Sequence, residues 1–122
     1  MAVVNLAAFG CVAAWIAALA GLALAAAHLM RRKPAAWLAG AHPLAATAAL
    51  VLLWTAIVRW PGPDDMLLNS GVFVVTLAFV AGAFLFALRR AGLRRMPAVV
   101  IGPHALVALV GCGLLIAGLV HA

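Results

Sequence analysis

Two histidines of this chain lie inside apolar segments, where an imidazole needs a specific partner. His42 stands in the stretch AGAHPLAA and His104 in the stretch VIGPHALVAL. A polar side chain inside a membrane-spanning segment is costly, and its presence indicates a function by default. Neutral imidazole is also a standard axial ligand of haem iron. The two histidines therefore have the chemistry to hold a metal cofactor between them.

Small residues follow each of these histidines at helical spacing. They are Ala45, Ala46 and Ala49 after His42, and Ala108 and Gly111 after His104. Residues three, four and seven positions apart share one face of a helix. A flat macrocycle needs such room, and the interior of a helical bundle is where facing helices hold a cofactor. We therefore expect one haem b with His42 and His104 as its axial, metal-binding ligands.

Further residues near the same ends of the segments have chemistry that suits a haem. His28, which follows Gly21 and Ala25 on its own helix face, is predicted to be a substitute ligand or a partner of a haem propionate. Arginine guanidinium groups bind carboxylates strongly, so four arginines are predicted to meet the propionates. These are Arg31, Arg32, Arg94 and Arg95. His121 lies near the other end of its segment and is not expected to take part.

A reading without a cofactor remains open for both histidines. Small residues on one face also let transmembrane helices pack closely against each other. Pro43 directly follows His42 and Pro103 directly precedes His104, and each proline removes one helical hydrogen bond. The carbonyl that is freed needs a partner in the membrane, and a nearby imidazole can supply one.

The composition determines which elements must position these residues. Of 122 residues, 70% are hydrophobic and 8% are charged, which is typical of a membrane protein. Four apolar segments, 3–29, 35–58, 66–88 and 98–120, each reach the roughly 20 residues that a membrane-spanning helix needs. Lipid offers no partners to free backbone groups, so helix is required. We expect an all-α integral membrane four-helix bundle, one domain over 1–122, with the first segment retained.

The basic residues predict how the helices are oriented. Seven of the eight basic residues lie in the first and third connections between segments. Basic residues favour the cytoplasmic side, so both termini are expected outside the cytoplasm, in a bacterial cytoplasmic (inner) membrane. The net charge of +6 then reflects contact with anionic lipid, and no nucleic acid partner is expected.

The chain also resembles itself. The stretch RRKPAAWLAGAHPLAATAALVLL at 31–53 matches RRMPAVVIGPHALVALVGCGLLI at 94–116 in its Arg-Arg-x-Pro opening and its histidine. Upstream, Gly21 pairs with Gly82 and Asn5 with Asn69. These matches predict two hairpin repeats, about 1–60 and 61–122, in parallel orientation because each contains two spans. The proline-to-histidine spacing differs by one residue between the copies.

Missing residue types narrow the function. The chain has no Glu, and both of its Asp lie outside the apolar segments, which disfavours a proton-coupled exporter. No set of side chains fits a hydrolase or a transferase, so the chain is at most an electron-transfer subunit. Cys11 and Cys112 are expected to be buried apolar side chains.

The expected function is electron transfer within or beside a respiratory or photosynthetic complex. The alternatives are a cofactor-free accessory subunit that packs against a larger membrane complex, and a small-solute permease. The expected partners are the lipid bilayer and either a larger membrane complex or further copies of the chain in a homo-oligomer.

Overall fold

Four long α-helices make up the protein in a computed structural model that describes residues 2–59, 66–93 and 95–121. For residues 2–4 only the backbone is described. The helices are α1 (Ala2–Leu29), α2 (Ala36–Arg59), α3 (Met66–Arg90) and α4 (Ala98–His121). They lie within two residues of the predicted segments, and the described residues contain no strand.

Each helix is long and apolar enough to cross a membrane, with a mean hydropathy between 1.8 and 2.5 over the most apolar 18 residues. Many large apolar side chains face outward, among them Phe73, Phe84 and Trp37. Among the described residues no polar or charged side chain is fully buried. Lipid-facing apolar side chains and backbone groups bonded within helices are what a bilayer requires. These features identify a multi-pass membrane protein with an all-helical fold.

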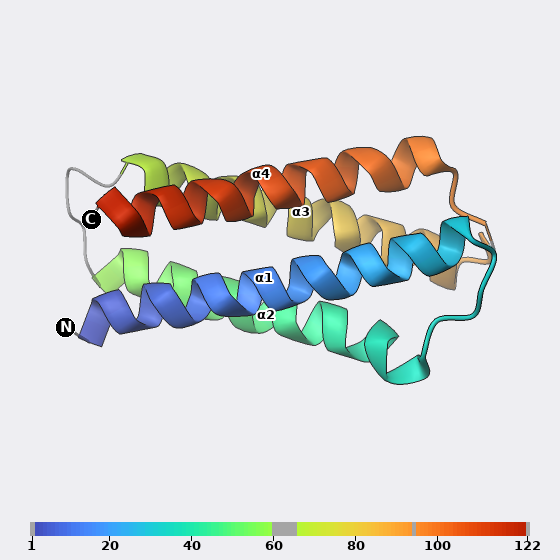
Figure 1. Cartoon of the computed structure of the whole chain (residues 1–122), viewed down its shortest axis with the longest axis horizontal. Coiled ribbons are helices and arrows are strands. Elements are labelled where there is room, and N and C mark those ends of the chain that lie inside the picture. Colours follow the sequence, from blue (N-terminus) through green and yellow to red (C-terminus); the bar gives the residue numbers. More distant parts are fainter. Residues whose placement is uncertain (1, 60–65, 94, 122) are drawn as a thin grey trace.

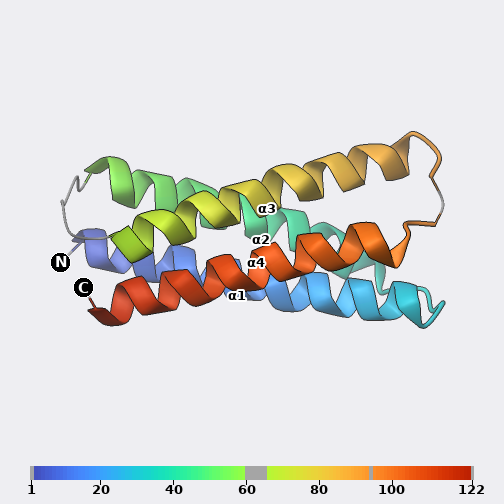
Figure 2. The same cartoon turned by 90° about the horizontal axis from the view of Figure 1, so that it is seen from above.

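The helices form two antiparallel hairpins that lie side by side (Figures 1 and 2). α1 packs mainly against α2, and α3 mainly against α4, whereas contacts between the hairpins are fewer and, of the neighbouring helices, α2 and α3 have the fewest. Helix α1 begins and α4 ends at one end of the bundle, which we call the terminal end. Residues 30–35, 91–93 and 95–97 lie at the opposite end, which we call the basic end.

Helices α1 and α3 end in the same way. The Arg32 N–H donates to the Ala27 carbonyl at 2.8 Å, and the Leu93 N–H donates to the Leu88 carbonyl at 3.2 Å. The residue before each donor has a positive φ, 54° at Arg31 and 108° at Gly92. This is the Schellman ending, in which a left-handed residue lets the backbone satisfy the last carbonyls of the helix. Arg31 thus adopts a conformation that glycine adopts without strain.

The largest cluster of buried side chains lies between the terminal end and the middle of the helices. Its members are Ala7, Cys11, Ala14, Ala18, Ala49, Leu53, Ala56, Leu68, Val72, Cys112 and Leu115. The other half of the bundle, toward the basic end, contains none of them beyond Ala18. The bundle is therefore held together mainly in one half.

Glycines allow the helices to approach closely inside each hairpin. A methyl group added at Gly10 would lie 2.7 Å from Leu53 Cγ, and one added at Gly71 would lie 2.8 Å from the Leu115 nitrogen. At Gly118 the added methyl would lie 2.6 Å from the backbone nitrogen of Leu68. These glycines are necessary because a side chain would occupy space that the neighbouring helix already fills.

Both internal prolines are accommodated without ending the helix. Helix α2 continues through Pro43, and α4 continues through Pro103. His42 and His104 are each the seventh residue of their helix. The one-residue difference in proline-to-histidine spacing arises before α2, because Pro34 stands two residues ahead of that helix whereas Pro97 directly precedes α4.

We predict that Gly118→Ala lowers the free energy of unfolding in detergent micelles by about 1–3 kcal/mol, the usual cost of overpacking. The reason is that the new methyl would meet backbone atoms of Leu68, which cannot move without separating α3 from α4. Gly113→Ala on the same helix is the control, because no described atom lies within 4 Å of its added methyl. Equal losses in the two variants would contradict this account.

We also predict that Arg31→Gly raises the free energy of unfolding by about 1 kcal/mol, because a left-handed conformation costs a non-glycine residue that much. Chemical denaturation in micelles measures the change. Arg32→Gly removes the same charge from a residue without positive φ and should bring no gain. Gly92→Ala, which creates the strain instead of relieving it, should lower stability by a similar amount.

Candidate cofactor site

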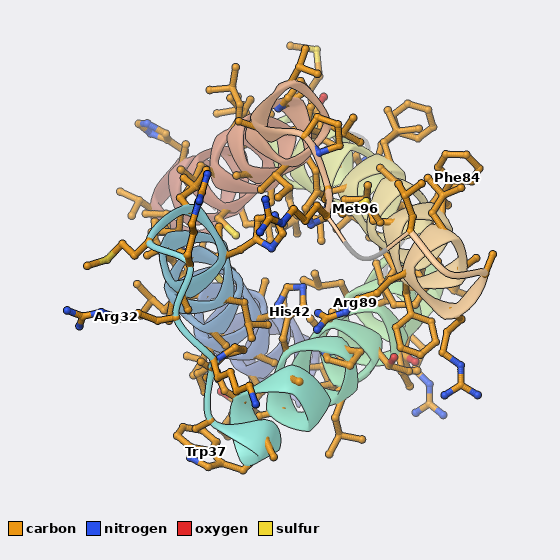
Figure 3. All side chains as sticks on the ribbon, turned by 90° about the vertical axis from the view of Figure 1, so that its right-hand side faces the viewer. Arg32, Trp37, His42, Phe84, Arg89 and Met96 are labelled. Carbon is orange, nitrogen blue, oxygen red and sulfur yellow. The ribbon has the colours of Figure 1, made fainter. Side chains whose placement is uncertain are left out.

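His42 and His104, the histidine pair, face each other inside the bundle. Their ring centroids are 6.4 Å apart and their planes are nearly perpendicular, at 87°. They come from α2 and α4, which lie diagonally across the bundle. In Figure 3 His42 lies in the space between the helices, whereas Trp37 and Phe84 extend outward. At a rise of about 1.5 Å per residue, both lie roughly 9 Å along their helices from the basic end.

Each ring of the histidine pair packs against a glycine of the neighbouring helix in its own hairpin. A methyl added at Gly21 of α1 would lie 2.8 Å from His42 Cε1, and one added at Gly82 of α3 would lie 3.0 Å from His104 Cε1. Any side chain at these two positions would push the imidazole away. The sequence paired Gly21 with Gly82, but nothing in their spacing showed that each contacts a histidine of the next helix.

A hydrogen bond determines the tautomer of His42. Its Nδ1 atom lies 2.7 Å from the carbonyl oxygen of Ala17, one turn before Gly21 on α1. A carbonyl can only accept, so Nδ1 must carry the proton and donate. In the neutral ring Nε2 then keeps its lone pair. Histidines that bind metals usually have this arrangement, with the second nitrogen donating to a carbonyl or carboxylate.

His104 differs from His42 in this respect. Its Nδ1 atom is buried and has no hydrogen-bond partner among the described residues. The backbone carbonyl of Ala78 lies near this ring but does not meet the geometry of a hydrogen bond. Ala78 stands four residues before Gly82, as Ala17 does before Gly21. A carbonyl at the equivalent position of the neighbouring helix therefore lies near each ring, but only His42 forms a hydrogen bond with it.

The surroundings of the histidine pair are loosely packed. In this half of the bundle the buried residues are the small side chains Ala17, Ala18, Ala20 and Ala78. A cavity of about 330 Å³ lies between α3 and α4, and His104 is one of the residues that line it. The half that contains the histidine pair therefore has open space next to His104.

His28 does not join the histidine pair. Its Nε2–H donates to the backbone carbonyl of Met96 at 2.9 Å, which ties the end of α1 to the connection before α4. The remaining predicted residues lie at the same end: Arg31, Arg32 and Arg95 are exposed, and Arg32 extends away from the bundle in Figure 3. Arg94 lies outside the described residues. Of the six predicted site residues that the structure describes, it thus brings two together.

No cluster of three or more His, Cys, Asp or Glu side chains occurs in the part of the chain that the structure describes. The histidine pair is a two-ligand arrangement, which suits a cofactor that brings its own equatorial ligands. Cys11 and Cys112 are free and buried in the terminal half, in keeping with the role predicted for them. Comparisons with protein-family models, with curated proteins and with solved structures found no match to this chain.

We predict that Gly21→Ala displaces the His42 ring and breaks its hydrogen bond to Ala17. The loss of one hydrogen bond should lower the free energy of unfolding by about 1 kcal/mol. The imidazole ¹⁵N resonances should change from those of a fixed Nδ1–H tautomer to those of a mixture of tautomers. Gly40→Ala, whose added methyl has no described atom within 4 Å, should leave both readouts unchanged. Unaltered resonances in Gly21→Ala would contradict the contact.

Proposed function

We propose that this protein binds one haem b between His42 and His104 and transfers electrons within or beside a membrane redox complex. The observation that carries the proposal is the facing pair of imidazoles inside an apolar bundle, 6.4 Å apart. Imidazole nitrogens bind metal ions at about 2 Å, so two rings on opposite sides of one ion have centroids roughly 6 Å apart. A bound haem supplies an iron that exchanges single electrons.

The tautomer of His42 supports ligation by its Nε2 atom. The Ala17 carbonyl holds the proton on Nδ1, so the opposite nitrogen has a free lone pair. Such a carbonyl also orients the ring and raises the basicity of the ligating nitrogen. The glycine contacts add a second restraint, because they hold each ring against the backbone of the next helix. His42, which has both restraints, would lose little conformational freedom on binding.

Loose packing between the hairpins favours room for a flat group. Of the neighbouring helices, α2 and α3 have the fewest contacts, and the buried cluster lies in the terminal half of the bundle. A haem entering between these two helices would displace fewer packed side chains than it would inside a hairpin. The connections that follow α1 and α3 carry Arg31, Arg32, Arg94 and Arg95, which would supply positive charge to the carboxylates of a haem. His28 would serve the basic end by positioning the connection that holds Met96.

We also propose how the bundle is oriented in the membrane and how its two hairpins arose. We place the basic end at the cytoplasmic face of a bacterial inner membrane, with both termini on the outer face. We attribute the two hairpins to duplication, with the same orientation for both copies. Support comes from their matching contacts, Gly10 with Leu53 and Gly71 with Leu115, together with the glycine contact of each histidine.

The absorption spectrum of the purified protein tests haem binding. We expect a Soret band and low-spin α and β bands, either as isolated or after addition of haemin. His42→Ala and His104→Ala should each abolish the low-spin bands because each removes an axial ligand. His121→Ala is the control, since His121 is exposed at the terminal end. A wild-type protein with no Soret band after incubation with haemin would exclude the proposal.

An accessory role without a cofactor is the second candidate, and one observation favours it. Gly102 and Gly113 lie on one face of α4, three turns apart, and a methyl added at either would meet no described atom within 4 Å. Outward-facing small residues let transmembrane helices of other chains approach closely. This role predicts a colourless protein that copurifies with larger subunits in fixed stoichiometry. Replacing Gly102 and Gly113 by leucine should then abolish copurification.

A further inference from the structure

The cavity between α3 and α4 is apolar except at one point. Its walls are side chains of α3 from Leu77 to Leu85 and of α4 from Val100 to Val107, and all of them are apolar except His104. Its volume of about 330 Å³ is at the lower end of the range for small-molecule sites, which are mostly apolar with few polar groups. The cavity is partly open to the outside of the bundle. It can therefore admit a ligand laterally.

Its position along the helices determines where such a ligand comes from. On α3 the lining residues extend from Leu85 to Leu77, and the helix ends at Arg90. At about 1.5 Å per residue, the cavity spans depths of roughly 8 to 20 Å from the basic end. These depths lie within the hydrocarbon of a bilayer about 30 Å thick. The ligand must then be dissolved in the membrane.

His104, one of the lining residues, has a ring nitrogen without a hydrogen-bond partner among the described residues. This nitrogen is Nδ1, whereas Nδ1 of His42 bonds to the Ala17 carbonyl. A buried polar group without a partner costs about 1–3 kcal/mol. Nδ1 is covered by protein atoms, so it reaches the cavity only when the ring turns about its Cβ–Cγ bond, which is a soft torsion in histidine. A carbonyl oxygen of a ligand would then accept the proton of Nδ1–H.

We propose that the cavity binds a membrane-dissolved quinone, with one quinone carbonyl accepting a hydrogen bond from His104. A quinone combines a flat apolar ring with carbonyl acceptors, whereas a lipid acyl chain fills apolar space but offers His104 nothing to bond. The inference rests on the proposed function, since the quinone would be the electron partner of the haem. The two nitrogens of His104 lie on different edges of the ring, so Nε2 can bind iron while Nδ1–H binds the quinone.

Binding of a short-chain benzoquinone to the full-length, haem-free chain in lipid nanodiscs tests the proposal. Isothermal titration with subtraction of empty nanodiscs measures it. We expect saturable binding that weakens about tenfold, or 1.4 kcal/mol, when the hydrogen bond is removed in His104→Leu. His104→Gln keeps an N–H donor and should retain most of the affinity. Ala81→Phe fills the cavity and should abolish binding, whereas Ala83→Phe, on the same helix outside the cavity, should not.

Several results would overturn the proposal. Uptake of the benzoquinone equal to that of empty nanodiscs would do so. Equal effects of Ala81→Phe and Ala83→Phe on quinone binding would also overturn it. Binding of a plain alkane as tight as that of the quinone would assign the cavity to acyl chains. A dimer that Ala81→Phe dissociates would assign it to a second copy of the chain.

Haem uptake by the same preparations distinguishes this proposal from the haem proposal. A wild-type protein that takes up haem but binds no quinone would refute only the quinone site. A protein that binds quinone but shows no Soret band with haemin would refute only the haem site. His104→Gln separates the two further, because it should bind quinone without giving a low-spin haem spectrum.

Discussion

The rest of the structure depends on the contact between each histidine of the pair and the glycine backbone of the helix beside it. An imidazole in an apolar bundle is tolerated only where its polar edge finds a partner and its flat face finds room. Gly21 and Gly82 give that room, and the absence of a side chain brings a backbone carbonyl within reach, used by His42 at 2.7 Å. The same two contacts limit how closely the helices of each hairpin approach in the half toward the basic end.

The two hairpins solve the packing problem with different residues. Corresponding residues of α1 and α3 are 61 positions apart in the sequence, as Gly21 and Gly82 are, and those of α2 and α4 are 62 positions apart, as His42 and His104 are. At positions matched in this way, the first hairpin has two buried alanines, Ala14 and Ala49. The second hairpin has Val75 against Gly111, where a methyl on the glycine would lie 2.7 Å from Val75 Cγ2. A larger side chain on one helix is thus compensated by a smaller one on the other, as close packing requires.

The sequence predicted the four spans to within two residues, because hydropathy and length alone determine a membrane helix. It also predicted that His42 and His104 lie at one depth. It could not predict the contacts with Gly21 and Gly82 or the bond to Ala17, since these depend on how two helices rotate about their axes in a chain rich in alanine. Asn5 and Asn69, which the sequence comparison paired, are 64 positions apart, three more than Gly21 and Gly82. His28 was grouped with the haem ligands by its type, whereas its bond to Met96 depends on the path of a connection.

The sparse contacts between the hairpins have a consequence for biogenesis. Because most contacts join helices that are adjacent in sequence, each hairpin can form as soon as its two helices have entered the membrane. Docking of α1–α2 on α3–α4 is then a later and separate step. During that interval the inner faces of both hairpins are accessible from the lipid, which gives a planar apolar molecule a route of entry that the finished bundle narrows.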